Sequence, residues 1–231
     1  MSFFKKVFNR GADKNAPRHL EHPRDLNVND MIKFKQYGPQ LLQQEMFKVD
    51  EVNSYHYRSG KEFEFVLRSS SGADSRSGNT TNHTLFLTID DSDDDPKMRM
   101  SVKVPRQIWQ QLFEEAALAL VIDQEQGHIV VKRRVDPDRV DSSHPLAFLA
   151  GWTAPEYIRE SFAIRGYYYK GDYRNKAIPD NADDCEELDY YGLESNDEKF
   201  ALEIEVYDGD TDVMVTYVTD VLLIEEMWPG N

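Results

Sequence analysis

Apolar and polar residues alternate along several stretches of the chain, which is the pattern of β-strands with one buried face. In residues 98–104, apolar side chains occupy the even positions and polar side chains the odd ones. Residues 200–206 are apolar at every even position, and residues 55–57 and 62–67 alternate on either side of the polar turn 58–61. These stretches predict antiparallel strands, and the two that flank the turn predict a β-hairpin.

A helical pattern follows the strand at 98–104. Pro105 cannot donate a hydrogen bond to a strand ladder and suits the first turn of a helix. From Ile108 to Leu120, apolar residues recur at helical spacing. The spacing predicts a helix over residues 106–120 that covers one face of the sheet. Residues 221–228, near the end of the chain, fit either a terminal helix or a last strand.

Two parts of the chain match each other without gaps at an offset of 115 residues. Residues 37–47 match 152–162, and residues 85–113 match 200–228. Few positions are identical, so the match is one of pattern. A repeat of this kind indicates two related folding units, with a site expected where they meet.

The repeat leads to a fold class and a division of the chain. We predict an α+β fold that is predominantly antiparallel β, with two repeated β units each followed by a helical element. The predicted divisions are a basic amphipathic tail over 1–26, a first unit with its helix over 27–122, a connector over 123–148 and a second unit over 149–231.

The two copies differ in their loops. Residues 69–82 form a long segment rich in Ser, Gly and Asn in the first copy, and the second copy carries extra length over residues 173–187. Such differences arise from divergence of function or from drift in solvent-exposed loops, and we favour drift.

Composition excludes several classes of protein. The formal net charge of −15 and a pI near 4.8 disfavour binding of nucleic acids or anionic membranes by the body of the chain. Cys185 is the single cysteine, which rules out an intramolecular disulfide and a zinc site of several thiolates. No apolar segment resembles a membrane span or a secretion signal, so we expect a cytoplasmic protein of bacterial origin.

The first 26 residues are basic, unlike the rest of the chain. Phe3, Phe4 and Phe8 would share one side of a short helix beside Lys5 and Lys6. One interpretation is an anchor that attaches the protein to a membrane surface or to a partner. The alternative, which we favour, is a frayed end whose aromatic side chains pack on the body of the protein.

The acidic turns at 90–95 and 208–212 occupy matching places in the two copies. Carboxylates at alternate positions can bind calcium, but the EF-hand loop needs glycine at its sixth position and glutamate at its twelfth. Counted from Asp208, those positions hold Val213 and Thr219, and the first copy fails in the same way. We therefore interpret both segments as solvated hairpin turns.

No familiar catalytic or metal-binding pattern occurs elsewhere. His19 and His22 lie close together without further donors, and acidic neighbours disfavour a thiolate at Cys185. We therefore predict no catalytic residue, no metal and no cofactor.

Tyrosines are the remaining chemical signal. A partner-binding surface is one interpretation, packing within the sheet is the favoured alternative, and stacking on a ligand is a third. The six tyrosines of the candidate surface belong to the second copy and are Tyr167, Tyr168, Tyr169, Tyr173, Tyr190 and Tyr191. Three tryptophans, Trp109, Trp152 and Trp228, are expected to fill the core or the seam between the copies.

The chain also resembles a group of bacterial domains. The residues that carry the resemblance are 1–8, the strand pattern of 55–67 and the segment 200–218. They are similar to domains of unknown function that are often encoded beside envelope-stress proteins of the phage-shock type. The resemblance implies an accessory protein of the bacterial cytosol or membrane periphery, and it implies no catalytic residues.

Three functional hypotheses remain. The first is a non-catalytic module that binds another protein through the seam between the copies or the tyrosine-rich edge. The second is an enzyme or small-ligand binder with a cleft between the copies, and with Asp93, Asp95, Asp208 and Asp210 at its mouth. A convergent pocket with buried, perturbed carboxylates would support the second hypothesis. The third is an acidic mimic of nucleic acid.

Overall fold

The computed structural model describes residues 18–43, 46–69, 83–90, 96–177 and 185–230. Within these residues the chain forms a sheet of twelve strands and two α-helices. The strands are β1 (Met31–Phe34), β2 (Met46–Tyr57), β3 (Gly60–Ser69), β4 (Thr84–Asp90), β5 (Lys97–Lys103), β6 (Val130–Lys132), β7 (Glu156–Arg159), β8 (Ile164–Tyr169), β9 (Glu186–Glu194), β10 (Phe200–Val206), β11 (Thr211–Asp220) and β12 (Ile224–Trp228). The helices are α1 (Arg106–Leu112) and α2 (Glu115–Asp123), and short 3-10 turns lie at Pro23–Asp25, Gln40–Leu42, Pro137–Arg139, Ala147–Leu149 and Val221–Leu223.

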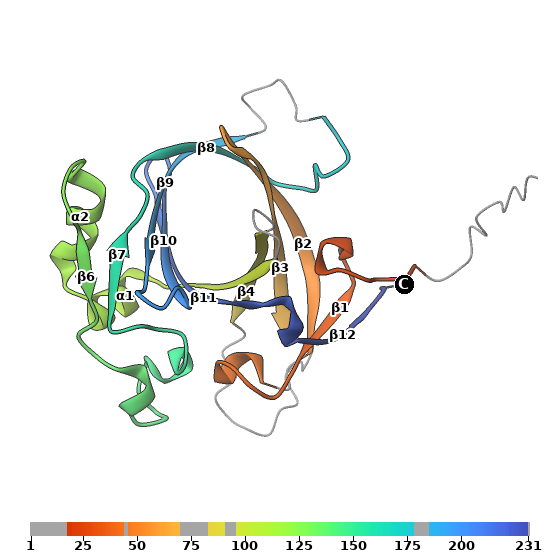
Figure 1. Ribbon diagram of the computed structural model, residues 1–231, viewed down its shortest axis with the longest axis horizontal. Helices are drawn as coiled ribbons and strands as arrows, with labels where there is room; N and C mark the ends of the chain where they lie inside the picture. Colours follow the sequence, from red (N-terminus) through yellow and green to blue (C-terminus); the bar gives the residue numbers. More distant parts are fainter. Residues whose placement is uncertain (1–17, 44–45, 70–82, 91–95, 178–184, 231) are drawn as a thin grey trace, which may run out of the picture.

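Eight of these strands close into a barrel. Their order is β2-β3-β4-β5-β11-β10-β9-β8, and β8 pairs back onto β2, so the ring has no open edge. Every neighbouring pair is antiparallel. Figure 1 looks through the ring, with β1 and β12 outside it next to β2, and β6 and β7 outside it on the side of α1 and α2.

The segments that match at the offset of 115 residues form corresponding hairpins of the barrel. They are β4–β5 and β10–β11, and the two hairpins join through the pair β5–β11. Ser101 of β5 lies directly opposite Thr216 of β11, its equivalent in the repeat. Because β5 and β11 run antiparallel, the first residues of the two strands lie at opposite ends of the barrel.

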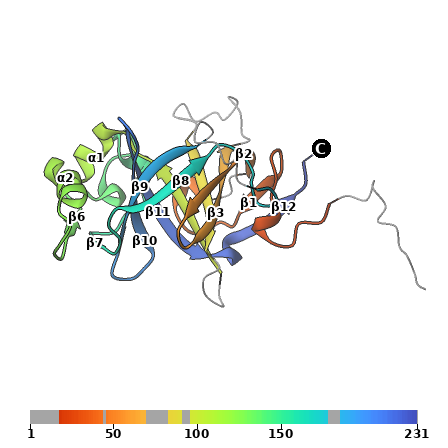
Figure 2. The same ribbon diagram turned by 90° about the horizontal axis from the view of Figure 1, so that it is seen from above.

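The apolar core lies outside the barrel wall. The apolar faces of β4, β5, β10 and β11 belong to one buried cluster with residues of both helices and of the segment 124–155. Trp109 of α1 and Trp152 are almost fully buried there, whereas Trp228 at the end of β12 keeps 36% of its surface exposed. Figure 2 shows the helices to one side of the barrel. The polar faces of the same strands therefore point into the barrel.

The fold is mainly β, so the predicted α+β class with a helix after each repeat is wrong. In the first copy the predicted helix over 106–120 is two short helices, because α1 ends where Phe113 turns into the core and contacts Trp109. In the second copy residues 221–228 form a 3-10 turn and β12. β12 pairs with β1, so tertiary pairing decides the structure of a segment whose own pattern allowed either element.

Candidate binding cavity inside the barrel

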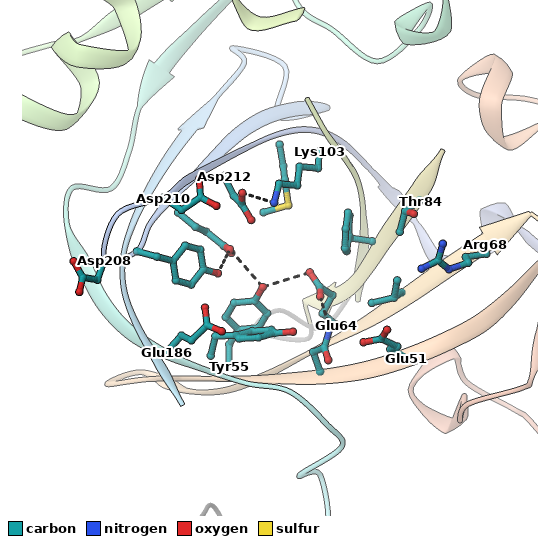
Figure 3. Close-up of a pocket in the computed structure, with 17 residues that line it drawn as sticks. Glu51, Tyr55, Glu64, Arg68, Thr84, Lys103, Glu186, Asp208, Asp210 and Asp212 are labelled. Carbon is teal, nitrogen blue, oxygen red and sulfur yellow. Dashed lines mark hydrogen bonds and ion pairs between the residues drawn. The ribbon is translucent and has the colours of Figure 1, made fainter. Parts of the chain in front are cut away.

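A cavity of about 480 Å³ occupies one end of the barrel. Its size lies within the range of ~300–1,000 Å³ that is usual for small-molecule sites. All eight barrel strands and the β10–β11 turn contribute to its wall (Figure 3). The lining residues are Glu51, Asn53, Tyr55, Glu64, Val66, Arg68, Thr84, Phe86, Lys103, Tyr168, Glu186, Glu205, Tyr207, Asp208, Asp210, Asp212 and Met214.

Two glutamates from opposite parts of the wall share one tyrosine. Glu64 comes from β3 and Glu205 from β10, and each residue is only 5% exposed. The hydroxyl of Tyr55 lies 3.5 Å from a carboxyl oxygen of each glutamate, as the dashed lines in Figure 3 show. The hydroxyl of Tyr207 donates a 2.6 Å hydrogen bond to Glu205. A single hydroxyl proton cannot satisfy both carboxylates.

Burial raises the pKa values of these two carboxyl groups into the neutral range, so that they are partly protonated at pH 7. It raises the pKa of Glu64 to about 7, although hydrogen bonds from Asn53 and Tyr55 act in the opposite direction. The pKa of Glu205 is raised to about 8, mainly by burial and also by the nearby charges of Glu64 and Glu203, although the hydrogen bond from Tyr207 acts in the opposite direction. Neither glutamate forms an ion pair with any Lys, Arg or His in the described part of the chain. The described residues therefore supply no counter-charge to the pair.

Asn53 leaves an unused hydrogen-bond acceptor at the cavity. Its amide nitrogen donates a 3.1 Å hydrogen bond to Glu64, while its carbonyl oxygen is buried without a partner among the described residues. The residue is only 4% exposed. An unpaired buried carbonyl costs about 1–3 kcal/mol, so the site favours a ligand that brings a donor.

Further carboxylates surround the outer part of the cavity. Glu186, Asp208 and Asp210 are exposed, and no ion pair reaches any of them within the described ranges. Asp212 pairs with Lys103, so the positive charge of that lysine is neutralised. Figure 3 shows Asp208, Asp210 and Glu186 along one side of the cavity.

Another buried glutamate of the barrel, Glu203, has hydrogen-bond donors for its carboxylate. Glu203 accepts hydrogen bonds from Arg99 at 2.9 Å, Ser101 at 3.1 Å and Thr216 at 2.8 Å. Ser101 and Thr216 are the equivalent pair at the β5–β11 seam. A buried carboxylate with a cation and two hydroxyl donors is a structural element of the wall, in contrast to Glu64 and Glu205.

The predicted tyrosine surface is divided between the inside and the outside of the barrel. Tyr168 lines the cavity and contacts Tyr55, with ring centroids 5.2 Å apart. Tyr190 packs edge-on against Tyr57 in the interior at 6.1 Å.

The other four tyrosines do not line the cavity. Tyr191 is buried in the outer core, and Tyr169 is buried and packs edge-on against Tyr173. Tyr167 is 37% exposed.

The described residues that flank the first acidic turn lie at the end of the barrel opposite to the second acidic turn. Asp208 and Asp210 lie at the cavity, whereas Asp90 and Lys97 pair at the opposite end of the barrel. Asp93 and Asp95 lie outside the described residues. Residues 70–82, the long loop of the first copy, also lie outside them.

The proposed N-terminal anchor, with Phe3, Phe4, Lys5, Lys6 and Phe8, also lies outside the described residues. No described helix has the length and apolar character needed to cross a membrane. His19 and His22 belong to no metal-binding group, since no three potential ligands converge anywhere in the described ranges.

Glu64 and Glu205 are not among the site residues predicted from the sequence, although a signal for them is present. Both occupy polar positions of strands that alternate, next to Phe65 and Ile204 respectively. We interpreted the polar faces as facing solvent, and closure of the barrel buries them instead.

Comparisons with protein-family models, with curated proteins and with solved structures find no match. The chemistry of the cavity is therefore what bears on function.

Proposed function

We propose that this protein binds a small organic cation inside its barrel, with an ammonium or guanidinium group held by Glu64 and Glu205. The observation that carries the proposal is a buried pair of carboxyl groups without a cationic partner among the described residues. A cation would let both groups ionise, and its N–H donors would reach the free oxygen of Asn53. The proposal develops the small-ligand hypothesis and replaces a cleft between two units with the inside of one barrel.

An organic cation suits the wall better than a metal ion does. Metal ions need several ligands at one point, and the described His, Cys, Asp and Glu residues provide no group of three. The rings of Tyr55 and Tyr168 line the same space and can stabilise an ammonium group through cation–π contact.

Simple binding suits the geometry better than catalysis. Two carboxyl groups with raised pKa values could act as general acid and base. However, the hydroxyl of Tyr55 lies within 3.5 Å of both groups and stands between them, where a reacting bond or water would have to sit. A binding role also fits the hypothesis of a non-catalytic accessory protein, for which a protein partner stays a prediction.

Calorimetric titration with n-butylamine at pH 8 tests the proposal. We expect the wild-type protein to bind the amine, and Glu205→Gln to weaken binding by about tenfold or more because a desolvated charge pair is lost. Glu125→Gln, which changes an exposed residue after α2, should bind like wild type. Glutamine preserves the shape of the side chain, and thermal unfolding followed by circular dichroism checks that each variant folds. No heat of binding at millimolar amine, or equal affinity of Glu205→Gln, would refute the proposal.

Binding should also release protons. At pH 7 the carboxyl groups of Glu64 and Glu205 are partly protonated, with pKa values of about 7 and about 8. An ammonium group favours their ionised forms, so we expect release of about one proton per amine and weaker binding below pH 7. Titrations in two buffers with different ionisation enthalpies measure the number of protons. Identical heats in both buffers would contradict the predicted linkage.

A further inference from the structure

The cavity has two separate places for positive charge. Glu64 and Glu205 lie at its inner part, and Glu186, Asp208 and Asp210 lie at its outer part. The outer carboxylates have no ion-pair partner in the parts of the chain that are described, and Lys103 is engaged by Asp212. A ligand with a single charge would leave one of these two places without a counter-ion.

The spacing of the two places follows from β10 and the turn after it. Glu205 is the penultimate residue of β10, and Asp208 comes three positions later. Asp208 and Asp210 lie in the β10–β11 turn beyond the end of the strand, where both are exposed, whereas Glu205 is only 5% exposed. An ammonium group at the buried pair therefore leaves the exposed carboxylates to a second charge, which suits an extended molecule with a charge at each end.

The cavity wall also offers an apolar strip on β3, β4 and β11. Val66 of β3 and Phe86 of β4 are direct neighbours across the sheet, and both line the cavity together with Met214 of β11. Val66 follows Glu64 by two positions, so it lies on the same face one step toward the outer end. An alkyl chain fits this strip, because methylene groups gain from burial against apolar side chains.

Asn53 independently indicates that a hydrogen-bond donor of the ligand lies in the inner part of the cavity. Its carbonyl oxygen is buried without a hydrogen-bond partner among the described residues, and the side chain lines the cavity next to Glu64. An ammonium group at Glu64 would supply the missing donor while the rest of the molecule points outward.

We propose that the ligand is a linear aliphatic diamine, bound lengthwise with one ammonium group at Glu64 and Glu205 and the other at Glu186, Asp208 and Asp210. This inference rests on the proposed function and adds the class of ligand. The outer carboxylates select for the second charge, and the strip of Val66, Phe86 and Met214 selects for the chain between the charges.

The test compares the affinities of 1,4-diaminobutane, 1,6-diaminohexane and n-butylamine by calorimetric titration at pH 8. We expect the better diamine to bind about two- to fivefold more tightly than n-butylamine, because the second ammonium group gains an additional, exposed ion pair. In the double variant Asp208→Asn/Asp210→Asn this advantage should disappear, so that the better diamine binds this variant no more tightly than n-butylamine does. The matched control is Asp123→Asn/Glu125→Gln, which removes the same charge from exposed residues near the end of α2 and should keep the advantage.

The outcomes separate this inference from the proposed function. If n-butylamine binds as tightly as both diamines, the diamine inference is overturned and the proposed function stands. If the advantage of the diamine survives in Asp208→Asn/Asp210→Asn, the placement of the second ammonium group is wrong. If no amine binds to the folded protein, both proposals fall.

Discussion

Glu64 and Glu205 should make the stability of the unliganded protein decrease as pH rises. Their pKa values, about 7 and about 8, lie above the ordinary glutamate value of 4.5, so the folded state holds more protons than the unfolded state between these limits. Stability from such groups is fully present below the unfolded pKa and is lost as pH rises through the folded pKa. We expect the free energy of unfolding to fall by a few kcal/mol between about pH 5 and 8.

Urea unfolding at several pH values tests this expectation. The variant Glu64→Gln/Glu205→Gln should lose most of the decrease, because glutamine carries no proton to release. Glu125→Gln should keep it. An unchanged pH dependence in the double variant would show that other groups control the effect.

Residue patterns predicted part of the site and missed its centre. The position of Asp208 and Asp210 in a turn after a strand was predictable, because the alternation of the strand ends before them. The meeting of Glu64 and Glu205 was not, since they are distant in sequence and converge only when the ring closes. A polar strand face looks the same in the sequence whether it faces solvent or the inside of a barrel.

At the scale of elements, the pairing of β8 with β2 completes the barrel and depends on a glycine. A Cβ atom at Gly166 of β8 would lie 2.4 Å from the ring of Tyr57 on β2. We expect Gly166→Ala to destabilise the protein by about 1–3 kcal/mol through overpacking. In a Tyr57→Ala background, the same substitution should cost much less. Urea unfolding of the four proteins gives the coupling energy, and additive effects would refute the proposed clash.

The strands themselves were predictable, but their closure was not. The alternation over 98–104 and 200–206 predicted strands that β5 and β10 confirm. The pairs β5–β11 and β2–β8 join residues more than 100 positions apart, and no local pattern specifies such partners. The prediction of a helix after the second copy is wrong for the same reason, since β12 pairs with β1.

At the scale of the whole molecule, the two seams should make the barrel unfold as one unit. Separating β2–β5 from β8–β11 would break the pairs β5–β11 and β2–β8 together and expose four strand edges. It would also open the outer core, in which Trp109 and Trp152 are both buried. We therefore expect one cooperative transition for the regions 27–122 and 149–231, although the sequence divides them into separate units.

Two tryptophan variants can test this cooperativity, since the two buried tryptophans report on different parts of the chain. Trp152→Phe/Trp228→Phe leaves Trp109 as the fluorescent probe, and Trp109→Phe/Trp228→Phe leaves Trp152. Within each variant, urea unfolding followed by fluorescence should coincide with unfolding followed by circular dichroism, because loss of either region removes the pairing of the other. Comparing two signals from the same variant cancels any loss of stability caused by the substitutions. Transitions that separate in either variant would show that the copies fold independently and that the seams contribute little to holding them together.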